Sequence, residues 1–165
     1  RMPRDAGERG RVAVLSDPQG ALFALVRTPA GDPTDDEPTL NEWLWTELWT
    51  RDVEAASRFY GEVLGYRRTT LENEVLSRGY VAFERDGNPR AGVIEYQVEG
   101  VRPSWLPYVR VADARATAQR AEELGGRVLI PPSDDLRGGT VALIADPSGG
   151  AVAVQEWTPS EGGDR

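Results

Sequence analysis

The stretch 43–66 constrains the fold more than any other part of this chain, because it predicts a strand, a tight turn and a helix in direct succession. Trp45, Glu47 and Trp49 alternate with residues of the opposite face, as in a β-strand. Asp52 stands where a helix N-cap is expected, and apolar residues then recur at helical spacing up to a glycine. The tryptophan-rich strand face is either part of the core, with one glutamate at its wet end, or the lining of a ligand pocket.

The remaining chain predicts the same order of elements twice, with one strand, one helix and three strands in each half. In the first half, the three strands after the helix are expected at 66–71, 79–84 and 91–97. In the second half, the elements are expected as a strand at 105–111, a helix from the Asp113 cap to Leu124, a strand at 127–130 and a hairpin at 140–145 and 151–157. Pro107 favours an edge position or a bulge for the strand that contains it.

Two internal repeats suggest how the chain is divided into domains. The strand end and helix cap at 49–52 match 110–113, an offset of 113 − 52 = 61 residues. Residues 10–20 match 139–149 without a gap, an offset of 139 − 10 = 129 residues. We therefore predict that 1–27 is the terminal hairpin of a preceding, mostly absent domain.

The other predicted boundaries follow from composition. Residues 28–40 are rich in proline and acidic side chains, as is typical of an extended linker. Residues 41–157 form a complete domain, and the tail 158–165 is expected to be disordered.

The composition excludes several kinds of site. The 165 residues include no Cys and no His, which removes thiolate chemistry, disulfides, the usual general base and the usual zinc ligands. The formal net charge of −8 disfavours nucleic acid as a partner and favours cationic molecules. No apolar run approaches the roughly 20 residues of a membrane helix, and no signal peptide is recognisable, so we expect a cytoplasmic protein with no membrane partner.

Two motifs carry a resemblance to a known family. They are the helix end Phe59-Tyr-Gly-Glu-Val-Leu-Gly65 and the closing turn Asp146-Pro-Ser-Gly149. With the doubled strand–helix–three-strand order, the chain resembles the glyoxalase/bleomycin-resistance/dioxygenase (vicinal oxygen chelate) superfamily, and in particular its tandem-domain bacterial members. The resemblance implies an α+β fold in which two βαβββ modules form a curved mixed sheet around a cavity.

Many members of that superfamily hold a divalent metal with four side chains, one from the first and one from the last strand of each module. By this resemblance the positions fall on Trp45, near Leu106 and on Ala153, and Glu95 is the one acidic residue that falls where the family has a ligand. One carboxylate is not a metal site, so we expect neither a metal nor another cofactor.

The same resemblance implies a set of cavity-lining residues. Glu47 would hold a cationic or hydroxyl group of a ligand, and Arg110 a carboxylate or carbonyl oxygen. Alternatively, these two side chains pair with each other and the aromatic rings fill the cavity. The expected ligand-binding residues are Trp45, Glu47, Trp49, Glu95, Leu106, Tyr108 and Arg110.

Three functions remain open at this point. The first is a metal-free protein that binds an aromatic or cationic small molecule in a Trp-lined cavity. The second is a lyase, isomerase or dioxygenase-like enzyme, with Glu47 or Glu95 as candidate catalytic general base. The third is a degenerate domain that mediates pairing. We expect a homodimer, or pairing with a preceding tandem domain.

Overall fold

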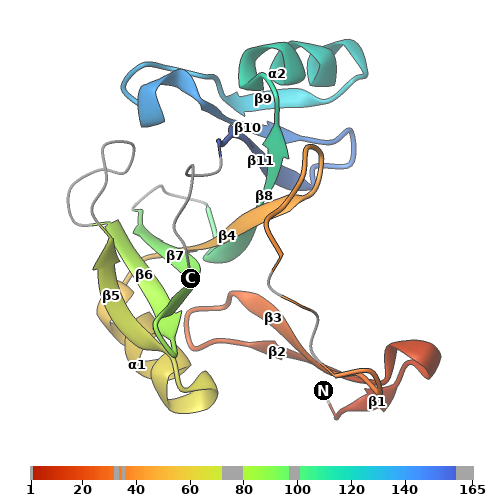
Figure 1. The fold of residues 1–165 in the computed structure, drawn as a ribbon, viewed down its shortest axis with the longest axis vertical. Helices are drawn as coiled ribbons and strands as arrows, with labels where there is room; N and C mark the ends of the chain where they lie inside the picture. The colour runs from red at the N-terminus through yellow and green to blue at the C-terminus, as the bar shows by residue number, and fades with distance from the viewer. Residues whose placement is uncertain (1, 32–33, 35, 72–79, 97–100, 159–165) are drawn as a thin grey trace. The chain divides into compact units, whose positions relative to one another are not determined.

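The computed structural model describes residues 2–31, 34, 36–71, 80–96 and 101–158. The described elements, in chain order, are β1 (Arg4–Asp5), η1 (Gly7–Arg9), β2 (Arg11–Ser16), β3 (Leu22–Arg27), β4 (Trp43–Thr50), α1 (Val53–Leu64), β5 (Arg67–Leu71), β6 (Tyr80–Arg85), β7 (Asn88–Glu95), β8 (Ser104–Val111), α2 (Ala114–Glu123), β9 (Arg127–Ile130), η2 (Arg137–Gly139), β10 (Val141–Ala145) and β11 (Ala151–Glu156). They confirm the predicted α+β class and the doubled order of strands and helices (Figure 1). The predicted strand ends at Gly79 and Gln97 and the tail 159–165 lie outside the described residues.

The chain divides into two compact units, each with its own helix. Unit 1 comprises Arg1–Asp36, Glu47–Thr70 and Tyr80–Trp105, and unit 2 comprises Glu37–Thr46, Leu71–Gly79 and Leu106–Arg165. The predicted domain boundaries and the enclosed cavity remain predictions.

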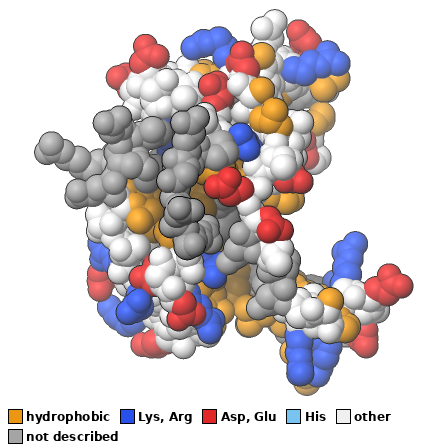
Figure 2. All heavy atoms as spheres, in the orientation of Figure 1, with side chains coloured by type: hydrophobic (Ala, Val, Ile, Leu, Met, Phe, Trp, Pro, Cys, Tyr) orange, Lys and Arg blue, Asp and Glu red, His pale blue; other side chains and the backbone are white. Residues whose placement is uncertain are grey.

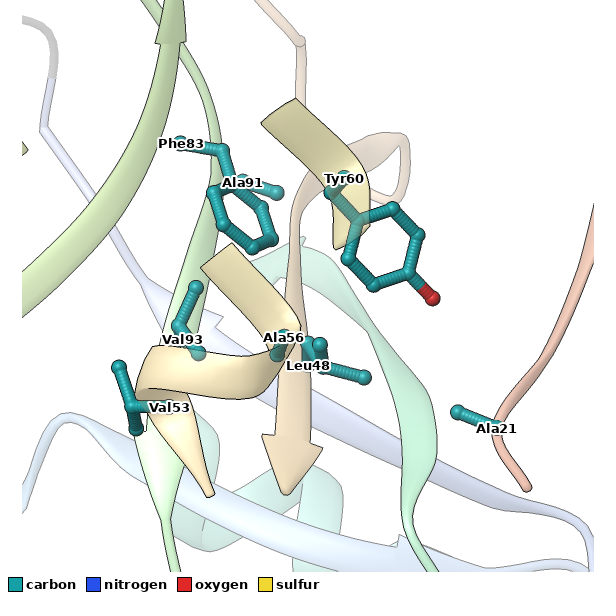
Figure 3. Packing of buried hydrophobic residues seen from close by; sticks show 8 residues of the cluster. All are labelled: Ala21, Leu48, Val53, Ala56, Tyr60, Phe83, Ala91 and Val93. Carbon is teal, nitrogen blue, oxygen red and sulfur yellow. The ribbon is translucent and has the colours of Figure 1, made fainter. Parts of the chain in front are cut away.

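Unit 1 contains a mixed sheet in the strand order β5-β6-β7-β4 and a separate sheet in the order β1-β2-β3. Strand β4 pairs in parallel with β7, and β6 pairs antiparallel with β7. Leu48, Phe83 and Val93 project from one face of the mixed sheet and pack with Tyr60 of α1 in a single buried cluster (Figure 3). Because side chains alternate along a strand, Glu47, Ala82 and Gly92 belong to the opposite face.

Both helices begin and end as predicted from local chemistry. The Asp52 Oδ1 atom accepts a hydrogen bond of 2.9 Å from the Ala55 N–H, and α1 ends at Gly65, whose φ is 72°. The Asp113 Oδ1 atom accepts the equivalent bond of 2.8 Å from the Ala116 N–H at the start of α2. The predicted correspondence between the two helix caps is confirmed.

In unit 2 the strands follow the order β4-β8-β11-β10-β9, with β8 and β11 parallel. Pro107 was expected to mark an edge strand or a bulge. The edge position is wrong, because β8 lies between β4 and β11. The pairing of β8 with β11 begins at Tyr108, directly after the proline, so the missing N–H of Pro107 lies outside that ladder. The core of unit 2 joins Ala114 and Ala118 of α2 to Val111, Ala142 and Val154.

The 129-residue repeat is visible as two turns with the same internal hydrogen bonds. In the turn 17–21, the Asp17 Oδ1 atom accepts from the backbone N–H groups of Gln19 and Ala21 at 2.9 and 2.8 Å. In the turn 146–150, the Asp146 Oδ1 atom accepts from those of Ser148 and Gly150 at 2.8 and 2.9 Å. The two turns differ in surroundings, because Asp17 is buried and Asp146 is exposed.

The turn 17–21 contacts α1 and the two residues that precede it. The Gln19 side chain accepts hydrogen bonds from the Arg51 and Asp52 N–H groups and donates one of 2.9 Å to the Asp52 carbonyl. The Tyr60 hydroxyl donates to the Asp17 Oδ2 atom at 3.2 Å and accepts from the Trp105 indole N–H at 3.0 Å. The N-terminal hairpin is therefore part of the packed structure of unit 1.

Candidate functional site

A buried carboxyl–phenol pair lies on the face of the unit 1 sheet opposite α1. The Glu47 side chain is fully buried, and its Oε1 atom accepts a hydrogen bond of 2.5 Å from the Tyr80 hydroxyl. A carboxyl group is rarely buried unless it is paired. The parallel alignment of β4 with β7 places Gly92 directly opposite Glu47.

The contact between Glu47 and Tyr80 requires a residue without a side chain at position 92. A Cβ atom on Gly92 would lie 1.7 Å from the Tyr80 hydroxyl oxygen and 2.9 Å from the Glu47 Cγ atom. The backbone conformation of Gly92 needs no glycine, since its φ is not among the positive values of the chain. The glycine therefore allows the Tyr80 side chain to lie close to the backbone of β7, which it crosses to reach Glu47.

An aromatic pair lies further along the same face of β4. The Trp49 and Tyr96 ring centroids are 5.7 Å apart, with a tilt of 50° between the rings. The Tyr96 hydroxyl donates to the Val101 carbonyl at 3.0 Å, and burial raises the pKa of this phenol. The acid–phenol pair and the aromatic pair thus come from β4, β6 and the end of β7. We call Glu47, Trp49, Tyr80, Gly92 and Tyr96 the Glu47 site.

The sequence identified Glu47 and Trp49, but it did not identify Tyr80, Gly92 or Tyr96. Strands β6 and β7 were predicted without a face being assigned to their residues. Had the alternation of β4 been extended to its neighbour β7, Gly92 would have been assigned to the face of Glu47. The contact of Tyr80 with Glu47 over Gly92 produces no periodic pattern in the sequence.

The other predicted site residue of unit 1 lies at the end of a strand. Glu95 aligns with Thr50 in the pairing of β7 with β4, and its side chain is exposed. Glu95 is therefore separated along β7 from Gly92, which aligns with Glu47, and its assignment as a ligand or base remains a prediction.

Four of the predicted residues belong to unit 2. Leu106 and Tyr108 are buried, and the Arg137 guanidinium lies 5.3 Å from the centre of the Tyr108 ring. Trp45 is half-buried. The Arg110 guanidinium donates to the carbonyls of Trp157 and Pro38 at 3.0 and 2.7 Å, so it holds two chain segments together.

Three of the positions that the family resemblance assigns to metal ligands, Trp45, Leu106 and Ala153, carry no metal-binding side chain, and Glu95 is the one carboxylate of the set. The β4–β7 alignment of Glu47 with Gly92 corresponds to the β8–β11 alignment of Tyr108 with Ala153, with offsets of 108 − 47 = 61 and 153 − 92 = 61. By this correspondence the residue of β7 equivalent to Ala153 is Gly92, whereas the resemblance assigned Glu95, which lies further along the same strand. Within the described ranges no three His, Cys, Asp or Glu residues gather in a way that could hold a metal ion. The residues present do not fit a resident metal of the family type.

A groove in unit 2 is separate from all the predicted residues. It has a volume of about 400 Å³ and is lined by Arg115, Ala118, Gln119, Glu122, Val128, Pro131 and Pro132.

Among the described residues, no helix is long and apolar enough to cross a membrane.

The chain belongs to the Glyoxalase/Bleomycin resistance protein/Dioxygenase superfamily, whose model matches residues 43–154. Among curated relatives, it is similar to a Mycobacterium tuberculosis protein provisionally named glyoxylase CFP32, with 30% identity over 160 residues, covering 95% of this chain and 60% of that protein. It is also similar to the anthracycline biosynthesis protein DnrV of Streptomyces peucetius, with 35% identity over 155 residues, covering 93% of this chain and 55% of that protein. The chain thus spans little more than half the length of these relatives.

Among solved structures, a variant of homoprotocatechuate 2,3-dioxygenase from B. fuscum shares the fold. The TM-score is 0.56 at 17% identity, and the match covers 96% of this chain and 49% of that one. This likeness shows a glyoxalase-type fold.

Proposed function

We propose that this protein binds a planar aromatic small molecule that carries a cationic or hydroxyl group. The observation that carries the proposal is the buried Glu47–Tyr80 pair, with 2.5 Å between the Tyr80 hydroxyl and the Glu47 Oε1 atom, beside the Trp49–Tyr96 rings. A buried carboxyl group offers a strong acceptor for an ammonium or hydroxyl group, and the aromatic rings offer a surface for stacking.

The relatives and the charge support the same ligand class. One relative is named for anthracycline biosynthesis, and anthracyclines are planar fused-ring compounds that commonly carry an amino sugar. The net charge of −8 would concentrate such cations around the protein. Glu95 is the one carboxylate among the positions that the resemblance assigns to metal ligands, so the proposal does not depend on a bound metal.

The proposal is tested by titrating the protein with doxorubicin and with its uncharged aglycone in a calorimeter. Glu47→Gln should weaken binding of doxorubicin by roughly tenfold or more, because a hydrogen bond to a charged group contributes about 1.5–3 kcal/mol. The aglycone should lose less affinity. Glu62→Gln removes the same charge from an exposed position of α1 and should change neither affinity. Absence of binding by both compounds would contradict the proposal.

An enzymatic function is the alternative that the same pair supports. A carboxyl group hydrogen-bonded to a phenol could abstract a proton next to a carbonyl group, with Glu47 as base and Tyr80 as the residue that orients it. Exchange of such protons on thioesters and 2-oxoacids in D₂O, followed by NMR, distinguishes the two functions. Exchange that disappears in Glu47→Gln supports catalysis, and exchange equal to the uncatalysed rate supports binding alone.

A further inference from the structure

The Trp49 indole carries a buried hydrogen-bond donor that has no partner. Its Nε1 atom is shielded from solvent and makes no hydrogen bond. One other buried side-chain atom shares this state among the described residues, the hydroxyl oxygen of Thr50. Thr50 follows Trp49 in β4, so the two side chains project from opposite faces of the strand, and only Trp49 lies on the face of Glu47.

An unpartnered buried donor destabilises a protein, so its presence needs an explanation. Burial removes the hydrogen bond that water would supply, and the great majority of buried polar groups are therefore paired. The neighbouring groups do not supply an acceptor. The Tyr96 hydroxyl bonds to Val101, and the Tyr80 hydroxyl bonds to Glu47. A phenylalanine would provide an aromatic ring in this position without leaving a donor unpaired.

We propose that Trp49 Nε1 donates a hydrogen bond to a neutral carbonyl oxygen on the ring system of the bound ligand. The proposal rests on the proposed function and names a further feature of the ligand, which is a quinone or ring ketone. A neutral acceptor is favoured over a carboxylate, because the site contains the Glu47 carboxyl group and the protein carries a net charge of −8. Glu47 would then accept a hydrogen bond from a donor group of the ligand, and Trp49 would donate one to an acceptor group of the same molecule.

The acceptor reaches Trp49 together with a local rearrangement. The Nε1 atom is inaccessible to a water-sized probe, so a carbonyl oxygen can approach it only if the surrounding groups shift. The Tyr96 ring, whose centroid is 5.7 Å from that of Trp49, is the described aromatic neighbour that such a shift would affect.

A matched pair of probes tests this inference. The compounds 2-(aminomethyl)anthraquinone and 2-(aminomethyl)anthracene carry the same ammonium group for Glu47 and differ in the two ring carbonyls. The wild-type protein should bind the quinone roughly tenfold more tightly than the anthracene, and Trp49→Phe should abolish that preference, because a change in stacking on the smaller ring affects both compounds alike. Trp43→Phe changes the exposed tryptophan at the start of the same strand and should preserve the preference.

A second measurement does not depend on a variant that folds. The ¹⁵N–¹H resonance of the Trp49 indole should move downfield on addition of the quinone and should not do so with the anthracene. If both compounds bind wild-type protein equally, or if Trp49→Phe retains the preference, the inference is overturned and the proposed binding function stands. If neither compound binds, both are overturned.

Discussion

Gly92 is the residue on which the contact between Glu47 and Tyr80 depends. We expect Gly92→Ala to destabilise the protein by about 1–3 kcal/mol, because the added methyl group would overlap the Tyr80 side chain. Urea unfolding gives the change in free energy. Tyr80→Ala removes the atoms with which that methyl group collides. The double variant should therefore lose less stability than the sum of the two single variants, and strict additivity would contradict the proposed close approach.

Thr50 places a hydroxyl group in the core without a hydrogen-bond partner. The side chain is fully buried and its Oγ1 atom has no hydrogen-bond partner. Thr50→Val should increase the free energy of unfolding by about 1 kcal/mol, because it removes an unpaired polar atom and keeps the branched shape. The control is Thr46→Val in the same strand, where the hydroxyl donates to the Leu106 carbonyl at 3.3 Å and its removal should be destabilising. A loss of stability in both variants would contradict this reading of Thr50.

Between elements, one glutamine side chain makes three hydrogen bonds from the N-terminal hairpin to the residues at the start of α1. Gln19→Ala should reduce stability by about 1 kcal/mol, because the three hydrogen bonds to the backbone of Arg51 and Asp52 are lost. Ser148 is the counterpart of Gln19 in the exposed turn, where its hydroxyl bonds to Asp146 of the same turn. Ser148→Ala should therefore cost less, and an equal loss would argue against a specific role for Gln19 in this contact.

The same contact predicts a dependence on alkaline pH. Burial raises the pKa of the Tyr60 phenol well above its usual value of 10.0; the Trp105 N–H opposes this rise and the Asp17 carboxylate adds to it. Since the folded-state pKa lies above that of the unfolded chain, the contribution to stability is complete below pH 10 and is lost as the pH rises above about 10. Urea unfolding at pH 8 and pH 10.5 should show a smaller decline for Tyr60→Phe than for wild type, and equal declines would contradict the assignment.

Local chemistry made the elements predictable, and long-range contacts limited what could be said of the site. The two aspartate caps and the glycine at the end of α1 act within a few residues, so both helices were located closely from sequence. The function of Gln19, whose partners lie 32 and 33 residues away, has no such local signal.

The Glu47 site follows the same rule. Alternation along β4 identified Glu47 and Trp49, but the partner Tyr80 lies on another strand and reaches Glu47 over a glycine. Pro107 shows the reverse case, because a preference that holds for strands in general was overridden by the surrounding sheet.

For the molecule as a whole, the net charge of −8 predicts how salt affects ligand binding. Acidic and basic side chains are interspersed on the face seen in Figure 2, so the attraction of a cation comes from the excess of acidic groups. Raising the salt concentration from about 0.1 M to about 1 M shortens the screening length from about 10 Å to about 3 Å. The association rate of doxorubicin in stopped flow should fall, while that of its aglycone should change little. Equal salt dependence for the two compounds would contradict an electrostatic contribution.

The contact between the hairpin and α1 means that the limits of the family match and the limits of the packed unit differ in this protein. The superfamily model begins at residue 43, after the hairpin has ended. A polypeptide cut at that limit would lack Asp17, Gln19 and Ala21, so the Tyr60 hydroxyl would lose its Asp17 acceptor and the N–H groups of Arg51 and Asp52 their Gln19 acceptor. The superfamily model thus covers less than the packed unit, because the core of unit 1 also includes Ala21 and Phe23 from outside that match. Fragments for expression are better delimited by packing than by the ends of a sequence family.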